Sequence, residues 1–171
     1  MASYSTLAVS NIRSYIWNIL QNEDLIDPND YYAEGFDSYL IPIIPAQQMP
    51  EFNNLLPGKT YLVYDYEVRK GRENWWISEE DMTISIVSTN YDKINAILNC
   101  LFDYFRRFDD SATDLQQYLH TNQLNDFRFH LLYVDSIISP EPLDREGAFQ
   151  VGQIKICYGY SRDLTTSGRF K

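Results

Sequence analysis

The spacing of hydrophobic positions changes along this chain, and the changes predict an alternation of helices and strands. The clearest helical pattern covers residues 91 to about 107, where apolar side chains recur at steps of three and four. The apolar row consists of Tyr91, Ile94, Leu98, Leu101, Phe105 and Phe108. Residues 88–90 offer N-cap side chains, and Asp92 suits the positive end of the helix dipole. We therefore expect an amphipathic helix with one buried face.

Two further segments have helical spacing. Residues 6–22 predict a first helix, which Ser3 or Ser5 would cap. Its apolar face consists of Ile12, Tyr15, Ile16, Ile19 and Leu20. The polar stretch at residues 109–125 predicts one short helix around residues 114–120.

Four segments have the two-residue alternation that is typical of strands. They cover residues 60–68, 82–87, 127–134 and 150–160. The first carries apolar groups on both faces, which predicts a strand with neighbours on both sides. Ser139 to Pro142 contains two prolines, and we expect it to end the third strand.

The order of these elements predicts one domain, residues 1–171, of the α+β class. We expect a mostly antiparallel sheet of about four strands, with two main helices packed on one face and long loops. Residues 28–58 hold five of the seven prolines and predict an extended segment, of which residues 39–44 lie along the domain. The polar tail at residues 161–171 is expected to be mobile.

The chain has more acidic than basic residues, and this excess bears on whether it can bind nucleic acid. The net charge is −10, whereas binding to nucleic acid through the bulk surface requires clustered Lys and Arg. A negatively charged protein surface is still compatible with DNA that passes close to it without binding. The 14 tyrosines favour either a surface for a protein partner or a Tyr-rich sheet face. Both interpretations remain open at this point.

The two cysteines and the lack of long apolar runs bear on location. Cys100 and Cys157 have no zinc-site spacing, so we expect two buried free thiols in a reducing compartment. The first residues lack the basic and apolar regions of a signal peptide, and no run approaches a membrane span. These features predict a soluble protein made in a cytoplasm.

No catalytic, metal or cofactor motif is present in the sequence. His120 and His130 have no metal-ligand spacing, and we expect both at or near the surface. The cluster Glu79, Glu80 and Asp81 is interpreted as a solvated loop end, because consecutive strand positions face opposite ways and do not converge on a cation. Residues 109 and 110, both Asp, are interpreted as the exit of the preceding helix. We therefore predict a protein that is not an enzyme.

The densest basic patch stands beside two tryptophans. It consists of Arg69, Lys70 and Arg72, followed by Trp75 and Trp76. A solvated hairpin loop explains the charges alone, but Trp and Arg dominate the energetics of protein interfaces. These five residues are our candidate interface.

The pattern of elements resembles the tail-terminator and tail-completion (head–tail joining, neck) proteins of tailed bacteriophages. The resemblance is carried by IPIIP at residues 41–45, TYLVYD at residues 60–65 and ISIVSTNYDKI at residues 84–94. It covers most of residues 6–160 and consists of element order and apolar positions.

The resemblance implies a structural virion protein of the tail or neck, assembled in the host cytoplasm. Such subunits form a homo-oligomeric ring, commonly a hexamer, that caps the tail tube, ends its polymerisation and meets neck or connector proteins. DNA would pass through the ring without specific binding, and neither a cofactor nor a membrane is involved. The patch from Arg69 to Trp76 would then contact a neighbouring subunit or the tube protein.

Two alternatives remain. The first is a head-completion or neck adaptor protein of the same virion. The second belongs to another class: a small-molecule-binding α+β domain with a pocket lined by the Tyr-rich sheet.

Overall fold

A computed structural model describes residues 7–31, 41–48, 58–69, 77–143 and 148–162. Within these ranges the helices are α1 (Ala8–Asn22), α2 (Tyr91–Phe105) and α3 (Asp109–Thr121). The strands are β1 (Ile43–Pro45), β2 (Tyr61–Val68), β3 (Ser78–Ser88), β4 (Phe127–Pro142) and β5 (Gln150–Arg162). Two short 3-10 turns complete the described part, η1 (Pro28–Tyr31) and η2 (Ala46–Gln48). None of the described helices is long and apolar enough to cross a membrane.

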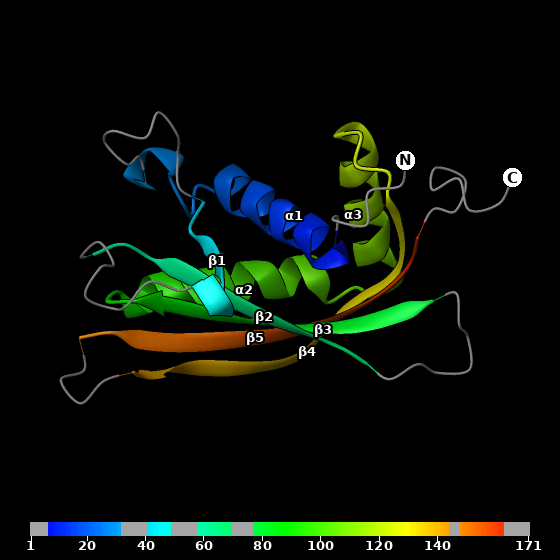
Figure 1. Ribbon diagram of the computed structural model, residues 1–171. Coiled ribbons are helices and arrows are strands. Elements are labelled where there is room, and N and C mark those ends of the chain that lie inside the picture. The colour runs from blue at the N-terminus through cyan, green and yellow to red at the C-terminus, as the bar shows by residue number, and fades with distance from the viewer. Residues whose placement is uncertain (1–6, 32–40, 49–57, 70–76, 144–147, 163–171) are drawn as a thin grey trace, which may run out of the picture.

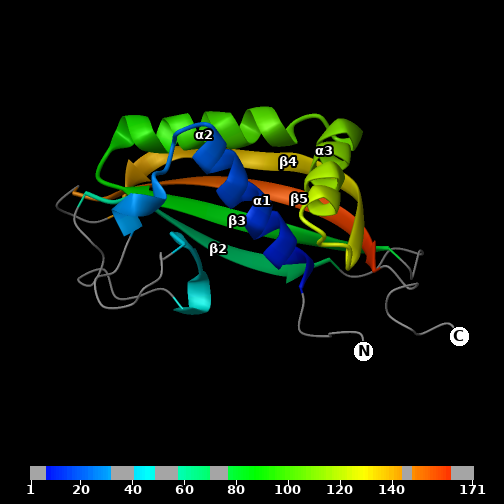
Figure 2. The same ribbon diagram turned by 90° about the horizontal axis from the view of Figure 1, so that it is seen from above.

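The strands form one sheet in the order β1-β2-β3-β5-β4. β1 runs parallel to β2, and every other neighbouring pair is antiparallel. The helices lie on one face of this sheet (Figure 1), and α2 follows β4 and β5 when seen from above (Figure 2). The predicted α+β class, mostly antiparallel sheet and one-sided helix layer are confirmed. The sheet has five strands instead of about four, and a third helix joins the layer.

The core lies between the helices and the covered face of the sheet. Ile84 on β3 and Ile154 on β5 are paired across the sheet, and both are 0% exposed. The predicted apolar face of α1 is entirely buried. Each such side chain contributes about 1.5–3 kcal/mol through removal of apolar surface from water. The alternation of apolar residues therefore determines which face the helices cover.

α2 begins as predicted and ends earlier than predicted. Asn90 caps it by accepting a hydrogen bond from the backbone N–H of Lys93 at 3.2 Å. The inner positions of the predicted apolar row are buried, but Tyr91 and Phe108 at its two ends are 48% and 55% exposed. α2 ends at Phe105, and Phe108 with a φ of 47° lies between α2 and α3, so the two helices do not form one continuous helix.

Two predictions about helix boundaries are wrong. Asp109 and Asp110 do not form a helix exit: they occupy the first turn of α3, where carboxylates suit the helix dipole. α3 is also longer than the short helix expected around residues 114–120. Ser3 and Ser5 lie outside the described residues, and α1 begins after Leu7 without a side-chain cap.

Three strands of the sheet extend further than predicted. β4 does not end before Ser139: it continues through Pro140 to Pro142. Proline is tolerated there because β4 is the last strand, and an edge position needs no outward N–H. Ser161 belongs to β5, so the C-terminal tail begins later than residue 161. β3 starts at Ser78, four residues before the predicted strand.

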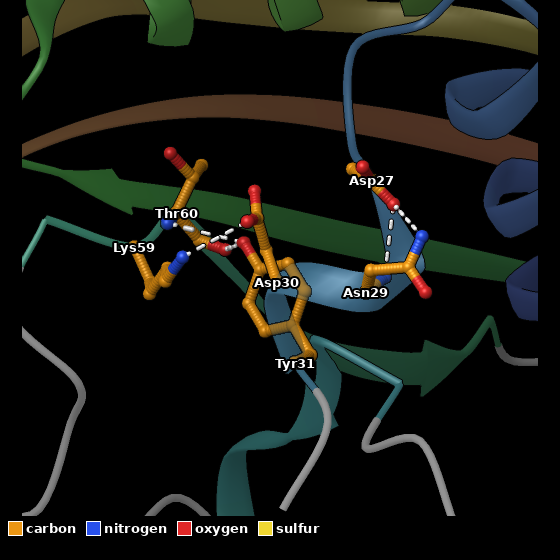
Figure 3. A network of polar contacts seen from close by, with 6 residues as sticks. All are labelled: Asp27, Asn29, Asp30, Tyr31, Lys59 and Thr60. Carbon is orange, nitrogen blue, oxygen red and sulfur yellow. Dashed lines mark hydrogen bonds and ion pairs between the residues drawn. The ribbon is translucent and has the colours of Figure 1, made fainter.

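The proline-rich segment is attached to the sheet at two described places. β1 pairs with β2, and the backbone N–H of Leu62 donates to the Pro42 carbonyl at 2.8 Å. Figure 3 shows the second place, where η1 meets the start of β2. There Lys59 Nζ lies 3.1 Å from Asp30 Oδ1, and the Tyr31 hydroxyl donates to the Thr60 carbonyl oxygen.

Candidate interaction surface

The face of the sheet opposite the helices carries an ionic cluster centred on Asp81. Asp81 follows buried Glu80 on β3 and points to the other side, since successive strand residues alternate. Arg69 Nε lies 2.7 Å from Asp81 Oδ1, and Lys155 Nζ lies 3.3 Å from Asp81 Oδ2. The same lysine lies 3.9 Å from Asp135 Oδ2 on β4. These charges tie the end of β2 to β3, β5 and β4.

The cluster changes the acidity of its members. Burial alone would raise the pKa of Asp81, but hydrogen bonds from Cys157, Arg69 and Lys155 outweigh it and hold the pKa below its ordinary value. Burial and the hydrogen bond to Asp81 raise the pKa of Cys157 to about 11. The Arg69 guanidinium points an N–H at the Cys157 sulfur from 3.1 Å. At neutral pH Cys157 is therefore a protonated thiol and a weak nucleophile.

A polar hollow of about 460 Å³ lies beside this cluster. It is lined from the β2 side by Asp65 and Glu67 and from β5 by Gln153 and Lys155. The Gln153 side chain donates to the Ser85 hydroxyl at 2.9 Å. Polar and charged side chains therefore form most of the lining of this hollow.

The acidic cluster at residues 79–81 is not the solvated loop end that we expected. Glu80 and Asp81 are only 5% and 8% exposed. On the helix-covered face, the Glu80 carboxylate accepts hydrogen bonds from the hydroxyls of Tyr158 at 2.7 Å and Tyr160 at 2.5 Å. The sequence reveals the opposite orientations of the two carboxylates. It does not reveal their partners, because those depend on how β3 and β5 are aligned.

Arg69 is the described member of our candidate interface. Its guanidinium is bound to Asp81, its side chain is 33% exposed, and its backbone N–H donates to the Glu79 carbonyl at 2.9 Å. Lys70, Arg72, Trp75 and Trp76 lie outside the described residues. Because Arg69 holds two strands together, a charge reversal of Arg69 would disturb the subunit itself and would not test an interface cleanly.

β4 offers an edge that the sequence did not reveal. It is the outer strand, and its one strand neighbour among the described residues is β5. Gln116 of α3 covers the start of this edge by accepting a hydrogen bond from the backbone N–H of Phe129 at 2.9 Å. Further along, Ile137 and Ile138 are 41% and 49% exposed, one on each face of the strand. An edge strand with exposed isoleucines is a surface that another chain can cover.

The described residues hold no group of three His, Cys, Asp or Glu side chains placed to bind a metal ion. His130 is on the surface of β4, where its Nε2 lies 2.8 Å from the Ser161 hydroxyl. Burial and the nearby charge of Arg128 lower its pKa. Cys100 is only partly buried, so the expectation of two buried thiols holds for Cys157 alone.

Comparison of the sequence with models of known protein families and with curated proteins finds no match.

Proposed function

We propose that this chain is a structural virion protein, a subunit of a ring that caps the tail tube of a bacteriophage. The ring would end tail polymerisation and join the tail to the neck. The observation that carries this proposal is the outer edge of β4, where Ile137 and Ile138 are both exposed, one on each face of the strand. An uncovered strand edge with apolar side chains favours pairing with another polypeptide.

A closed ring requires that two different surfaces of one subunit meet. β4 lies at one end of the strand order and β1 at the other, so the sheet has two unlike edges. Its partners would be further copies of itself, commonly six in all, together with the tube protein and a neck or connector protein. The net charge of −10 would let DNA pass through the ring without specific binding.

Electron microscopy of the purified protein with growing tail tubes tests this function. We expect rings with a central hole, and tubes that stop growing with a ring at one end. Ile138→Lys should reduce ring formation because it places a charge at the contact, while Leu7→Lys is the control, since Leu7 is 44% exposed just before α1. Tubes that grow unchanged, with no rings in the micrographs, would contradict the proposal.

A head-completion or neck adaptor is the alternative within the same virion. The exposed edge of β4 serves this role as well, since it does not specify which protein covers it. Co-sedimentation with portal complexes instead of tail tubes would favour the adaptor.

A small-molecule-binding domain is the alternative from another class. The polar hollow of about 460 Å³ on the open sheet face is the observation that favours it. Its lining is mainly polar and charged, unlike the Tyr-rich pocket that we expected. A rise in melting temperature with a polar metabolite, in a protein that stays monomeric, would support it.

A further inference from the structure

A second hollow, of about 290 Å³, follows the outer side of α1. Arg13, Trp17 and Gln21 line it at steps of four residues, which places them in one row along the helix. Tyr118 of α3 and Ile41 also line the hollow. The hollow is therefore lined by one cation, Arg13, by the aromatic rings of Trp17 and Tyr118, and by the aliphatic side chain of Ile41.

Arg13 is held in position by a hydrogen bond, and its charge has no ion-pair partner among the described residues. Its Nε donates to the Ile43 carbonyl oxygen at 2.8 Å, which anchors the guanidinium between α1 and β1. No described carboxylate lies within ion-pair distance of it. The Tyr118 hydroxyl donates to the Ser14 carbonyl oxygen at 3.2 Å, which holds α3 against α1. The site is thus built by α1, α3 and the segment at Ile41, and the described residues supply no anion to it.

The exposed part of β4 carries complementary groups. Ile137 and Ile138 are its exposed apolar side chains, and Glu141 follows them. Glu141 is exposed, and no described cation lies within ion-pair distance of it, whereas Asp135 is already close to Lys155. Prolines on both sides of Glu141 restrict the backbone to an extended form.

We propose that residues 137–141 of one copy dock into the α1 hollow of the next copy, where Glu141 pairs with Arg13. Ile138 shares a face of β4 with Glu141 by register and would pack against Trp17, since Trp and Arg at a contact usually carry most of its energy. In Figure 1, α1 lies in the helix layer above the sheet and the later part of β4 lies along the lower side of the sheet, so the two surfaces of one copy lie apart. The contact joins unlike surfaces, as ring closure requires. It rests on the proposed function and adds the residues that form the ring contact.

A charge swap tests this pairing. Glu141→Arg, Arg13→Glu and the double variant are compared with the wild type by sedimentation velocity over a range of protein concentrations. Each single variant places like charges together, and we expect it to weaken ring formation by about tenfold or more. The double variant restores an opposite pair in reversed order and should recover the ring.

Arg107→Glu is the matched control, because Arg107 is exposed just after α2 and has no part in the proposed contact. Arg13→Glu also removes the bond to Ile43, so melting temperatures are measured for all variants. Glu141→Arg changes an exposed side chain and should melt like the wild type. This variant alone therefore tests the contact even if Arg13→Glu folds poorly.

Single variants that form the wild-type ring, or a double variant no better than the weaker single one, would overturn the pairing and leave the proposed function standing. A wild-type protein that forms no ring, alone or on tail tubes, would overturn both. Loss of the ring in Arg107→Glu to the same extent would also overturn the pairing, because any loss of positive charge would then suffice.

Discussion

The two faces of the sheet each bury a carboxylate, but the carboxylates have different kinds of partner. Glu80 on the covered face is held by two neutral tyrosine hydroxyls, whereas the next residue, Asp81, meets Arg69 and Lys155 on the open face. The covered face is otherwise an apolar surface under the helices. The difference shows that both faces of β3 hold the fold together, one through apolar packing under the helices and the other through paired charges that join neighbouring strands.

The largest effect should come from a cavity under the helices. Ile84→Ala removes a fully buried side chain of β3, and we expect the free energy of unfolding to fall by about 2–5 kcal/mol. Thr83→Ala, the next position on the open face, should cost no more than about 1 kcal/mol. Chemical denaturation of both variants measures the contrast. Equal losses would show that the open face is as tightly packed as the covered one.

The ionic cluster should give the next largest effect. Asp81→Asn removes the charge that Arg69 and Lys155 share, and we expect a loss of about 1.5–3 kcal/mol at neutral pH. The folded-state pKa of Asp81 lies below the ordinary value of 3.8, so its contribution is present above that value and is lost as pH falls through the folded-state pKa.

Stability measured against pH therefore separates this charge from simple packing. The wild type should lose its advantage over Asp81→Asn in the acid range below pH 3.8. An advantage that is constant from neutral to acid pH would show that the carboxylate charge contributes nothing.

On the covered face, Tyr158→Phe removes one of the two donors to Glu80. A buried carboxylate that loses a donor should lower the free energy of unfolding by about 1–3 kcal/mol. Tyr64→Phe is the control, because no described group hydrogen-bonds to the Tyr64 hydroxyl, and it should change stability by less than about 0.5 kcal/mol. If both variants melted at the same temperature, the hydrogen bonds to Glu80 would be irrelevant to stability.

The two described glycines of β5 give the smallest contrast. A Cβ at Gly152 would lie 2.7 Å from Ile94 Cγ2 and 2.9 Å from Leu98 Cδ1 of α2, so Gly152→Ala should cost about 1 kcal/mol. At Gly159 the nearest atom would be 3.5 Å away, which is ordinary contact. Gly159→Ala should be neutral or stabilise by up to about 1 kcal/mol. Thermal melts that rank the two variants in reverse would contradict the close approach of α2.

The fold follows from the sequence where apolar spacing alone determines the structure. The rows that contain Ile84, Ile94 and Ile154 predict the strands, the long helix and the buried face. Predictions failed where a backbone angle or an edge position decides the outcome. The positive φ of Phe108 separates α2 from a helix that already starts at Asp109, and β4 continues to Pro142 because an outer strand can tolerate proline.

The candidate surfaces could be predicted only in part. The opposite directions of Glu80 and Asp81 follow from strand alternation, but their partners depend on the alignment of β3 with β5. The ion pair of Arg69 with Asp81 could not be predicted either, because it depends on the alignment of β2 with β3, which brings the two ends of the loop together. The hollow at Arg13 was not visible in the sequence, because it is formed by α1, α3 and Ile41 together.

The central claim is that this subunit assembles into a closed ring, and its mass in solution tests that claim most directly. One chain has a mass of 20.1 kDa, so six copies give about 121 kDa. Multi-angle light scattering should find a single species near that mass, or near another whole multiple that does not grow as protein is added. A mass of 20.1 kDa at every concentration, or an open series of increasing masses, would contradict the account.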